Sequence, residues 1–269
     1  MHHFAKRMFV AAAPLLLTGC LWGPGKFASD LALKKDGAFV LDYRGQIVLQ
    51  TPPDASESEK PWKDSMARCT VDSAGEDDKE RPCTKAETAQ QKTDHERRAK
   101  SKRDETEQMA KMFGLAGLDD ESGRAFAAKL GKYAGYRSVQ YRGKGVFEVD
   151  YHFEGSAKQD FIFPALPDND FLIPFIAIRR RADGSVLVTA PAFTGGSGPL
   201  GARAGAAATS EMKNGPVSHA QGRFTLVTDG EILTNNSEDG PAPNAAGRQL
   251  RWDVGSTSAK IPEALIRLR

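Results

Sequence analysis

The sequence has few cysteines, few histidines and almost no net charge. Its 269 residues include 3 Cys and 5 His, and 37 basic residues face 35 acidic ones. After residue 20, no stretch is apolar over the roughly twenty residues that a membrane-spanning helix needs. These features exclude a cysteine-rich scaffold, a bundle of membrane helices and a chain whose overall field attracts nucleic acid.

The first residues of the chain have the three parts of a secretory signal. Lys6 and Arg7 form a short positive segment, and the apolar run 8–17 that follows is too short to span a bilayer stably. Residues 17–20, Leu-Thr-Gly-Cys, come directly after this run. They resemble the lipobox of bacterial lipoproteins, in which the chain is cut just before the cysteine.

This resemblance implies that residues 1–19 are a cleaved signal peptide and that Cys20 carries lipid. The Cys20 thiol would receive a diacylglycerol, and its new amino group an acyl chain such as palmitate. A thiolate suits this chemistry as a nucleophile, and two or more chains give stable anchoring. Leu21 rather than Asp follows, which favours the outer membrane and a protein facing the periplasm, with exposure at the cell surface left open. Cleavage also removes Lys6 and Arg7 and leaves a formally neutral mature chain.

The two remaining cysteines predict a disulfide. Cys69 and Cys83 lie in a stretch too polar to build a core, and the cell envelope is oxidising. No histidines cluster near them, and no pair of the scattered histidines has the spacing of metal ligands. We therefore expect no metal site and no other cofactor.

Hydrophobic alternation predicts strands on both sides of a central interruption. Apolar positions between 31 and 49 indicate a hairpin or meander, with turns at residues 36–37 and 44–45. Residues 147–154 form the clearest half-buried strand. Residues 171–178 predict a covered strand, which Pro174 places at an edge or a bulge. Residues 186–188 pair across a turn at 182–184, and further strands are predicted around 224–226, 232–233, 250–252 and 265–268.

Two segments interrupt these strands. Residues 51–104 form a charged insertion: 51–84 is expected to be irregular, and a solvated helix from about 86 to 113 should pack only through Met109, Met112 and Phe113. Asp119-Asp120 caps a second helix that runs to about Lys132, with one apolar face. The residues of this apolar face are Phe126, Leu130 and Tyr133. The second interruption, residues 193–222, is a loop rich in Gly and Ala.

These elements predict one domain of the α+β class. Residues 20–26 serve as the lipidated N-terminus and tether, and residues 27–269 form the domain. We expect a mostly antiparallel sheet with one or two inserted helices.

The two ends of the mature chain resemble known lipoproteins. Residues 24–47 resemble the start, and residues 224–268 the close, of uncharacterised lipoproteins from alphaproteobacteria, and both are weakly similar to LppM-type lipoprotein domains. The resemblance implies a small α+β envelope domain that binds lipid or glycolipid. It leaves 51–104 and 193–222 unmatched and transfers no catalytic residue.

Two groups of residues invite a functional interpretation. Ser197, in a glycine-rich stretch, would need His152 or His219 as a base to act as a hydrolase nucleophile, but the stretch lacks the Gly-x-Ser-x-Gly elbow and favours a mobile linker. Arg179 and Arg181, with an arginine between them, end an apolar strand and could hold a phosphate or carboxylate. The alternative is a polar strand end entering a turn.

The sequence therefore favours a non-enzymatic envelope lipoprotein that acts as a binding or scaffolding module. A lipid- or glycolipid-binding or transfer domain is the alternative, and a serine hydrolase is a third. The expected partners are the membrane, through the N-terminal lipid, and a lipid or an envelope protein, but not nucleic acid.

Overall fold

The computed structural model describes residues 21–50, 61–71, 79–166, 174–195 and 219–268. Within these ranges, the chain forms two facing sheets, a two-stranded ribbon and two α-helices, with mostly antiparallel strands. This confirms the predicted α+β class. No described helix combines the length and the apolar character that crossing a membrane requires. The predicted signal peptide, Cys20 and Ser197 lie outside the described residues.

The larger sheet is built around a long hairpin. Among the described strand pairs of this sheet, β1–β10 is parallel and the others are antiparallel. Gly37, at φ 89°, closes the turn between the hairpin strands, as the sequence predicts. In spatial order the strands are β12 (Ala242–Asn244), β13 (Gly247–Val254), β10 (Gln221–Thr228), β1 (Leu21–Leu33), β2 (Ala38–Gln50), β6 (Val146–Ser156) and β5 (Tyr136–Gly143).

Two predictions for the β1–β2 hairpin are wrong. β2 continues through residues 44–45 without a turn, and Gly45 instead faces a bulge in β1 at φ 151°. A Cβ on Gly45 would lie 2.3 Å from the Lys26 carbonyl oxygen, so only glycine fits there. Residues 21–26, predicted as a tether, belong to β1, and Trp22 is 1% exposed. β1 therefore includes Leu21, the first described residue.

The smaller sheet covers one face of the larger one. The predicted turn at 182–184 is confirmed and joins two of its strands. The covered strand predicted at 171–178 is found from Ile176 onward, and residues 171–173 lie outside the described residues. It lies inside the sheet rather than at an edge, because Pro174 stays outside the ladder to which it cannot donate. In spatial order the strands are β11 (Glu231–Asn235), β14 (Glu263–Arg267), β9 (Ser185–Thr189), β8 (Ile176–Arg180) and β7 (Phe161–Phe163).

Aromatic rings fill the space between the sheets. Tyr43 of β2 meets Phe163 of β7 with 4.9 Å between ring centroids, and Phe39 meets Phe161 at 5.0 Å. Alternation along β2 sends these side chains to the same face. Burying each ring contributes roughly 1.5–3 kcal/mol, so the two sheets share one core.

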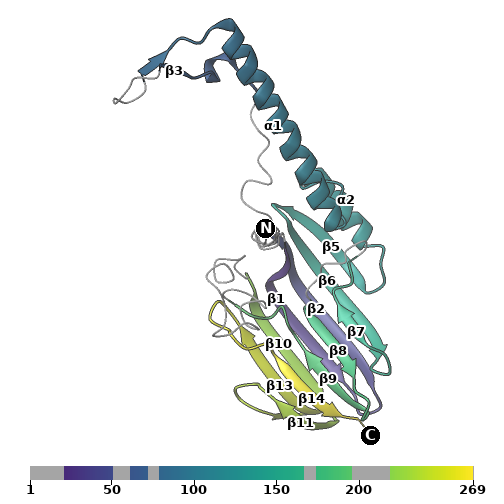
Figure 1. The fold of residues 1–269 in the computed structure, drawn as a ribbon. Helices are drawn as coiled ribbons and strands as arrows, with labels where there is room; N and C mark the ends of the chain where they lie inside the picture. Colours follow the sequence, from purple (N-terminus) through teal and green to yellow (C-terminus); the bar gives the residue numbers. More distant parts are fainter. Residues whose placement is uncertain (1–20, 51–60, 72–78, 167–173, 196–218, 269) are drawn as a thin grey trace, which may run out of the picture.

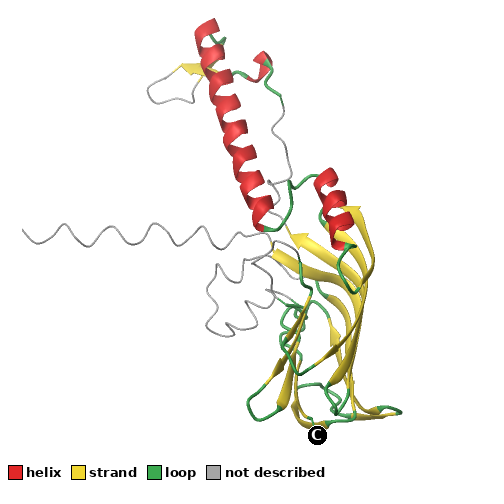
Figure 2. Cartoon of the chain, turned by 90° about the vertical axis from the view of Figure 1, so that its right-hand side faces the viewer, coloured by secondary structure: helices red, strands yellow, loops and turns green. Residues whose placement is uncertain are grey.

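A long helix and its disulfide-linked tip project from the sheets, as both views show (Figures 1 and 2). We call residues 61–71 and 79–112 the arm. It contains a short 3-10 turn η2 (Asp64–Met66), the ribbon β3 (Cys69–Val71) and β4 (Lys79–Arg81), and α1 (Lys85–Met112). At about 1.5 Å per residue, α1 spans roughly 42 Å. It contacts the core near its C-terminal end, through Met109, Ala110 and the C-cap Phe113, which confirms the predicted contacts of Met109 and Phe113. The side chain of Met112, also predicted to pack there, lies outside the described residues.

A second helix, α2 (Asp120–Leu130), covers the edge of the larger sheet. Asp119 is its N-cap, and Phe126 and Leu130 are buried, as predicted. Tyr133 is instead 46% exposed, because the helix ends at Leu130 and the periodicity of its buried face does not extend past Gly131.

The two sheets and α2 together form the body, which has two distinct ends. At the base, Leu21 pairs with Gln50, and the Leu49 N–H donates to Gly145 in the β5–β6 turn at 2.8 Å. At the far end lie the β1–β2 turn, the β8–β9 turn and the C-terminal strand (Figure 1). The arm leaves the body from the base.

Candidate functional site

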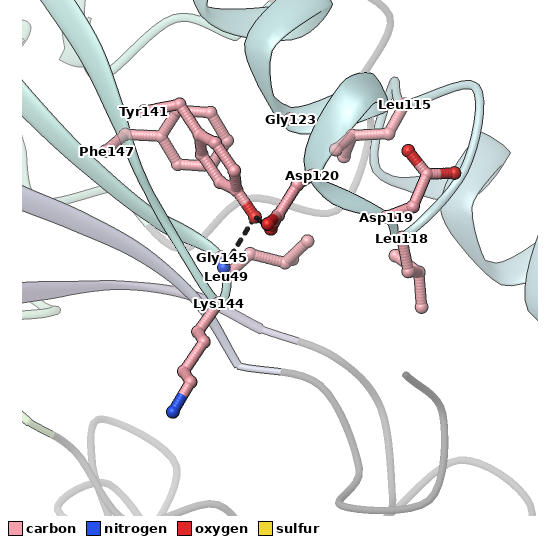
Figure 3. Close-up of a pocket in the computed structure, with 10 residues that line it drawn as sticks. All are labelled: Leu49, Leu115, Leu118, Asp119, Asp120, Gly123, Tyr141, Lys144, Gly145 and Phe147. Atoms are coloured by element: carbon pink, nitrogen blue, oxygen red, sulfur yellow. Dashed lines mark hydrogen bonds between the residues drawn. The ribbon is translucent and has the colours of Figure 1, made fainter. Parts of the chain in front are cut away.

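A pocket of about 410 Å³ lies at the base, between α2, the loop that precedes it and the β5–β6 turn (Figure 3). Its volume falls in the range of roughly 300–1,000 Å³ that is usual for small-molecule sites. One part of its wall is apolar and the other carries polar groups. The apolar residues are Leu49, Leu115, Leu118 and Phe147, and the polar ones are Asp119, Asp120, Tyr141 and Lys144.

Tyr141 joins the helix and sheet sides of this pocket. Its hydroxyl donates to Asp120 Oδ1 at 2.9 Å and accepts a hydrogen bond from the Gly145 N–H at 3.2 Å. Partial burial raises the pKa of Tyr141, and the bond to Asp120 adds to the effect. The phenol therefore stays protonated at neutral pH and holds α2 against the β5–β6 turn.

The remaining polar groups of the pocket give it charges of both signs. The Asp119 carboxylate accepts from the Ser122 N–H at 2.8 Å, and this bond lowers the pKa of Asp119, so the group is ionised at neutral pH. Lys144 is held at φ 52° between two glycines of the turn, and its side chain is exposed. The opening is thus polar on both sides.

The polar groups of this pocket are better placed to bind a ligand than to catalyse a reaction. The carboxylates of Asp119 and Asp120 already serve a helix cap and a tyrosine hydroxyl. The leucine and phenylalanine side chains offer an apolar ligand dispersion contacts and removal from water. An apolar group with a polar end fits these walls.

The pocket lies at the end of the body where β1 begins. Leu49, in its wall, pairs with Trp22, and the neighbouring pair is Leu21 with Gln50. Trp22 also stacks on Phe126 of α2. The structure therefore places the pocket at the end of the body to which Cys20 connects.

The predicted arginine cluster lies at the opposite end. Arg179, Arg180 and Arg181 are all exposed, and the Arg180 N–H donates to Asp160 Oδ1 at 3.1 Å. β8 ends at Arg180, so strand alternation does not extend to Arg181, which lies in the turn. The structure does not bring these arginines to the pocket.

The described histidines that were candidate bases lie apart from the pocket. His152, a candidate hydrolase base, lies on β6 with Nδ1 2.8 Å from Asp42 and Nε2 3.4 Å from Glu154. His219 is exposed just before β10. Among the described residues, no cluster of His, Cys, Asp and Glu could hold a metal ion.

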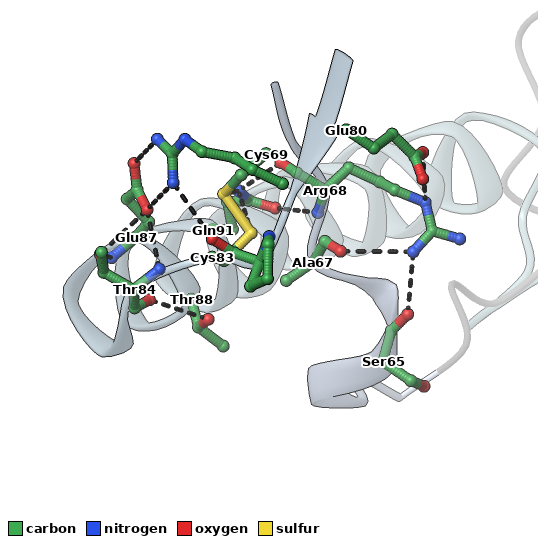
Figure 4. The surroundings of a disulfide bond; sticks show 12 residues. Ser65, Ala67, Arg68, Cys69, Glu80, Cys83, Thr84, Glu87, Thr88 and Gln91 are labelled. Atoms are coloured by element: carbon green, nitrogen blue, oxygen red, sulfur yellow. Dashed lines mark hydrogen bonds and ion pairs between the residues drawn. A yellow bond between two sulfur atoms is a disulfide. The ribbon is translucent and has the colours of Figure 1, made fainter. Parts of the chain in front are cut away.

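The predicted disulfide is present at the tip of the arm (Figure 4). Cys69 and Cys83 are bonded, with 5.3 Å between their Cα atoms. The side-chain amide of Gln91 accepts from the Arg68 N–H at 3.1 Å and donates to the Arg68 carbonyl at 2.8 Å. These two bonds fix α1 to the segment that leads into β3. A surface hollow beside the bond is lined mainly by polar residues.

Compared with known proteins, the chain matches no family model and no curated protein. The pocket itself was missed in the sequence, because its walls come from three separate segments. The signal that could have pointed to it is the run Tyr141 to Gly145, where two glycines flank Lys144 after an aromatic residue.

Proposed function

We propose that the protein is a lipid-anchored lipoprotein of the cell envelope that acts as a non-enzymatic binding module, with the pocket at the base as its ligand site. The observation that carries the proposal is the pocket itself, with leucine and phenylalanine walls and a polar opening. Its position beside Leu21 supports a module that works at a membrane surface, since Cys20 would hold this end at the bilayer.

The same position favours one alternative for the ligand, a lipid or glycolipid taken from the bilayer. An apolar chain that leaves the membrane at the base would reach Leu49 and Leu118 without crossing the body. The hydroxyl and carboxylate at the Tyr141–Asp120 pair would face the polar end of such a ligand. A scaffolding role needs no such pocket.

Native mass spectrometry of the purified protein tests this proposal. We expect bound apolar molecules that are lost in Leu118→Trp, because the larger ring fills the half-buried wall. Leu187→Trp is the matched control: Leu187 is also half-buried, but it lies on the outer face of the smaller sheet. Equal ligand loading in both variants, or none in the parent chain, would show that the pocket is not the site.

A further inference from the structure

α1 carries a dense group of cations about halfway along the arm. The seven residues 97–103 contain five basic side chains and no acid. Four of the five are exposed and one is partly exposed. We call these residues the basic girdle, because helical spacing places them around the axis. The five residues are Arg97, Arg98, Lys100, Lys102 and Arg103.

The geometry of the arm limits where it can lie on an anchored protein. α1 leaves the body from the base, which is also the end where β1 begins at Leu21 (Figures 1 and 2). A helix of roughly 42 Å with charges on all sides cannot enter the hydrocarbon of the bilayer, where each charge is costly. Under the proposed cleavage before Cys20, the lipid-bearing residue directly precedes β1, so the anchor would hold the base close to the membrane.

We propose that α1 lies along the membrane surface beside the anchor, with the basic girdle against anionic lipid headgroups. The inference rests on the proposed lipid anchor at Cys20. Cationic side chains near an anionic bilayer are attracted to it within about a Debye length. Asp94 pairs with Arg97 at 3.1 Å, and further acids flank the girdle, so the attraction is local and falls with salt.

One side of α1 is covered by the segment that precedes β3. Near the tip, Trp62 packs on His95, with 5.5 Å between ring centroids, and Gln91 holds Arg68. The segment before β3 thus covers one side of α1, which leaves its other sides for the headgroups. The arm would keep the base and its pocket close to the lipid surface.

The test uses the acylated full-length protein in vesicles, with a fluorophore on a single introduced cysteine. Cys69 and Cys83 are bonded and Cys20 is acylated under the proposal, so the new thiol alone reacts. Ser101→Cys places the label on an exposed position within the girdle, and Ala182→Cys places it in the exposed far-end turn as the matched control. A quencher attached to lipid headgroups reports proximity.

In anionic vesicles we expect strong quenching at position 101 and little at position 182. Replacing the five girdle cations by Gln should reduce quenching at 101 about fivefold or more, as should high salt. Removing five cations at the far end should leave it unchanged. The far-end cations are Lys34, Lys35, Lys158, Arg179 and Arg181.

Two outcomes overturn the inference. Weak quenching at position 101, no stronger than in neutral vesicles, would show that α1 does not lie on the membrane, and unchanged quenching without the girdle would show that its charges do not hold the arm there. Failure of the anchor has a different signature, because protein without lipid on Cys20 would wash off the vesicles before any label is read.

Discussion

The indole of Trp22 stacks on the ring of Phe126, with 5.4 Å between centroids and 22° between planes. Phe147 of β6 approaches the same indole, also at 5.4 Å. The second described residue of the chain is therefore part of the core, and it links the start of β1 to α2 and to the wall of the pocket.

We predict that Trp22→Ala lowers the free energy of unfolding by about 3–5 kcal/mol, the usual cost of deleting a large buried ring. Denaturant unfolding of the chain from residue 21 measures it. Trp62→Ala is the control, because Trp62 lies on the arm and should leave the unfolding of the body unchanged. A loss below about 1 kcal/mol for Trp22→Ala would mean that residues 21–26 behave as the tether that the sequence predicts.

The β1–β2 hairpin shows why sequence patterns predicted the fold class correctly but placed the start of the first strand too late. Large apolar residues at alternate positions, Leu31 and Leu33 and then Phe39, Leu41 and Tyr43, made β1 and β2 predictable. Residues 23–25, Gly-Pro-Gly, break that alternation, although the backbone continues in the strand and absorbs the change in a bulge opposite Gly45. Side-chain patterns do not report a bulge, because it is set by the partner strand.

The candidate site was hidden for a different reason. Leu49, Leu118 and Tyr141 are far apart in the sequence and meet only after α2 packs on the β5–β6 turn. The disulfide was predictable, because two cysteines in an oxidising compartment leave few choices. Contacts between distant segments can be predicted only when the order of the strands in the sheet is known, and local sequence patterns do not give that order.

Breaking the disulfide should loosen the tip of the arm and leave the body intact. The bond closes a loop with a sequence separation of 14 residues, which contributes roughly 3 kcal/mol on the chain-entropy model. In Cys69→Ser/Cys83→Ser, amide exchange should rise in β3, β4 and the first turns of α1. The strands of the body should exchange as before. Loss of cooperative unfolding of the body would show that the arm is part of its core.

The first turns of α1 should lose stability as the pH falls below 4.5. The Arg81 side chain, followed by the N–H and hydroxyl of Thr84, lowers the pKa of Glu87 from its ordinary 4.5 to about 2. Because the folded-state pKa is the lower one, this stabilisation is complete above pH 4.5 and is lost as the pH falls from 4.5 toward 2. Amide exchange in the first turns of α1 should therefore rise across that window, after correction for the intrinsic rate.

Glu87→Gln serves as the control for this titration, since it removes the ionisable group but keeps the side-chain shape. The variant should show no such change between pH 4.5 and 2. A Glu87 carboxyl signal that titrates near 4.5 in the parent chain would contradict the ion pair with Arg81.

The last prediction concerns Cys20. Cys20→Ser should move the protein from the membrane to the supernatant, because loss of the acyl chains leaves only surface attraction. Each buried methylene contributes about 0.8 kcal/mol, so two or more chains far exceed what exposed cations supply. The measurement is membrane fractionation after a high-salt wash, which removes the contribution of the basic girdle. Cys69→Ser/Cys83→Ser is the matched control, since it also loses cysteines but should stay with the membrane. If Cys20→Ser remained bound after the wash, the anchor would lie elsewhere, and the base would lose its assigned place at the bilayer.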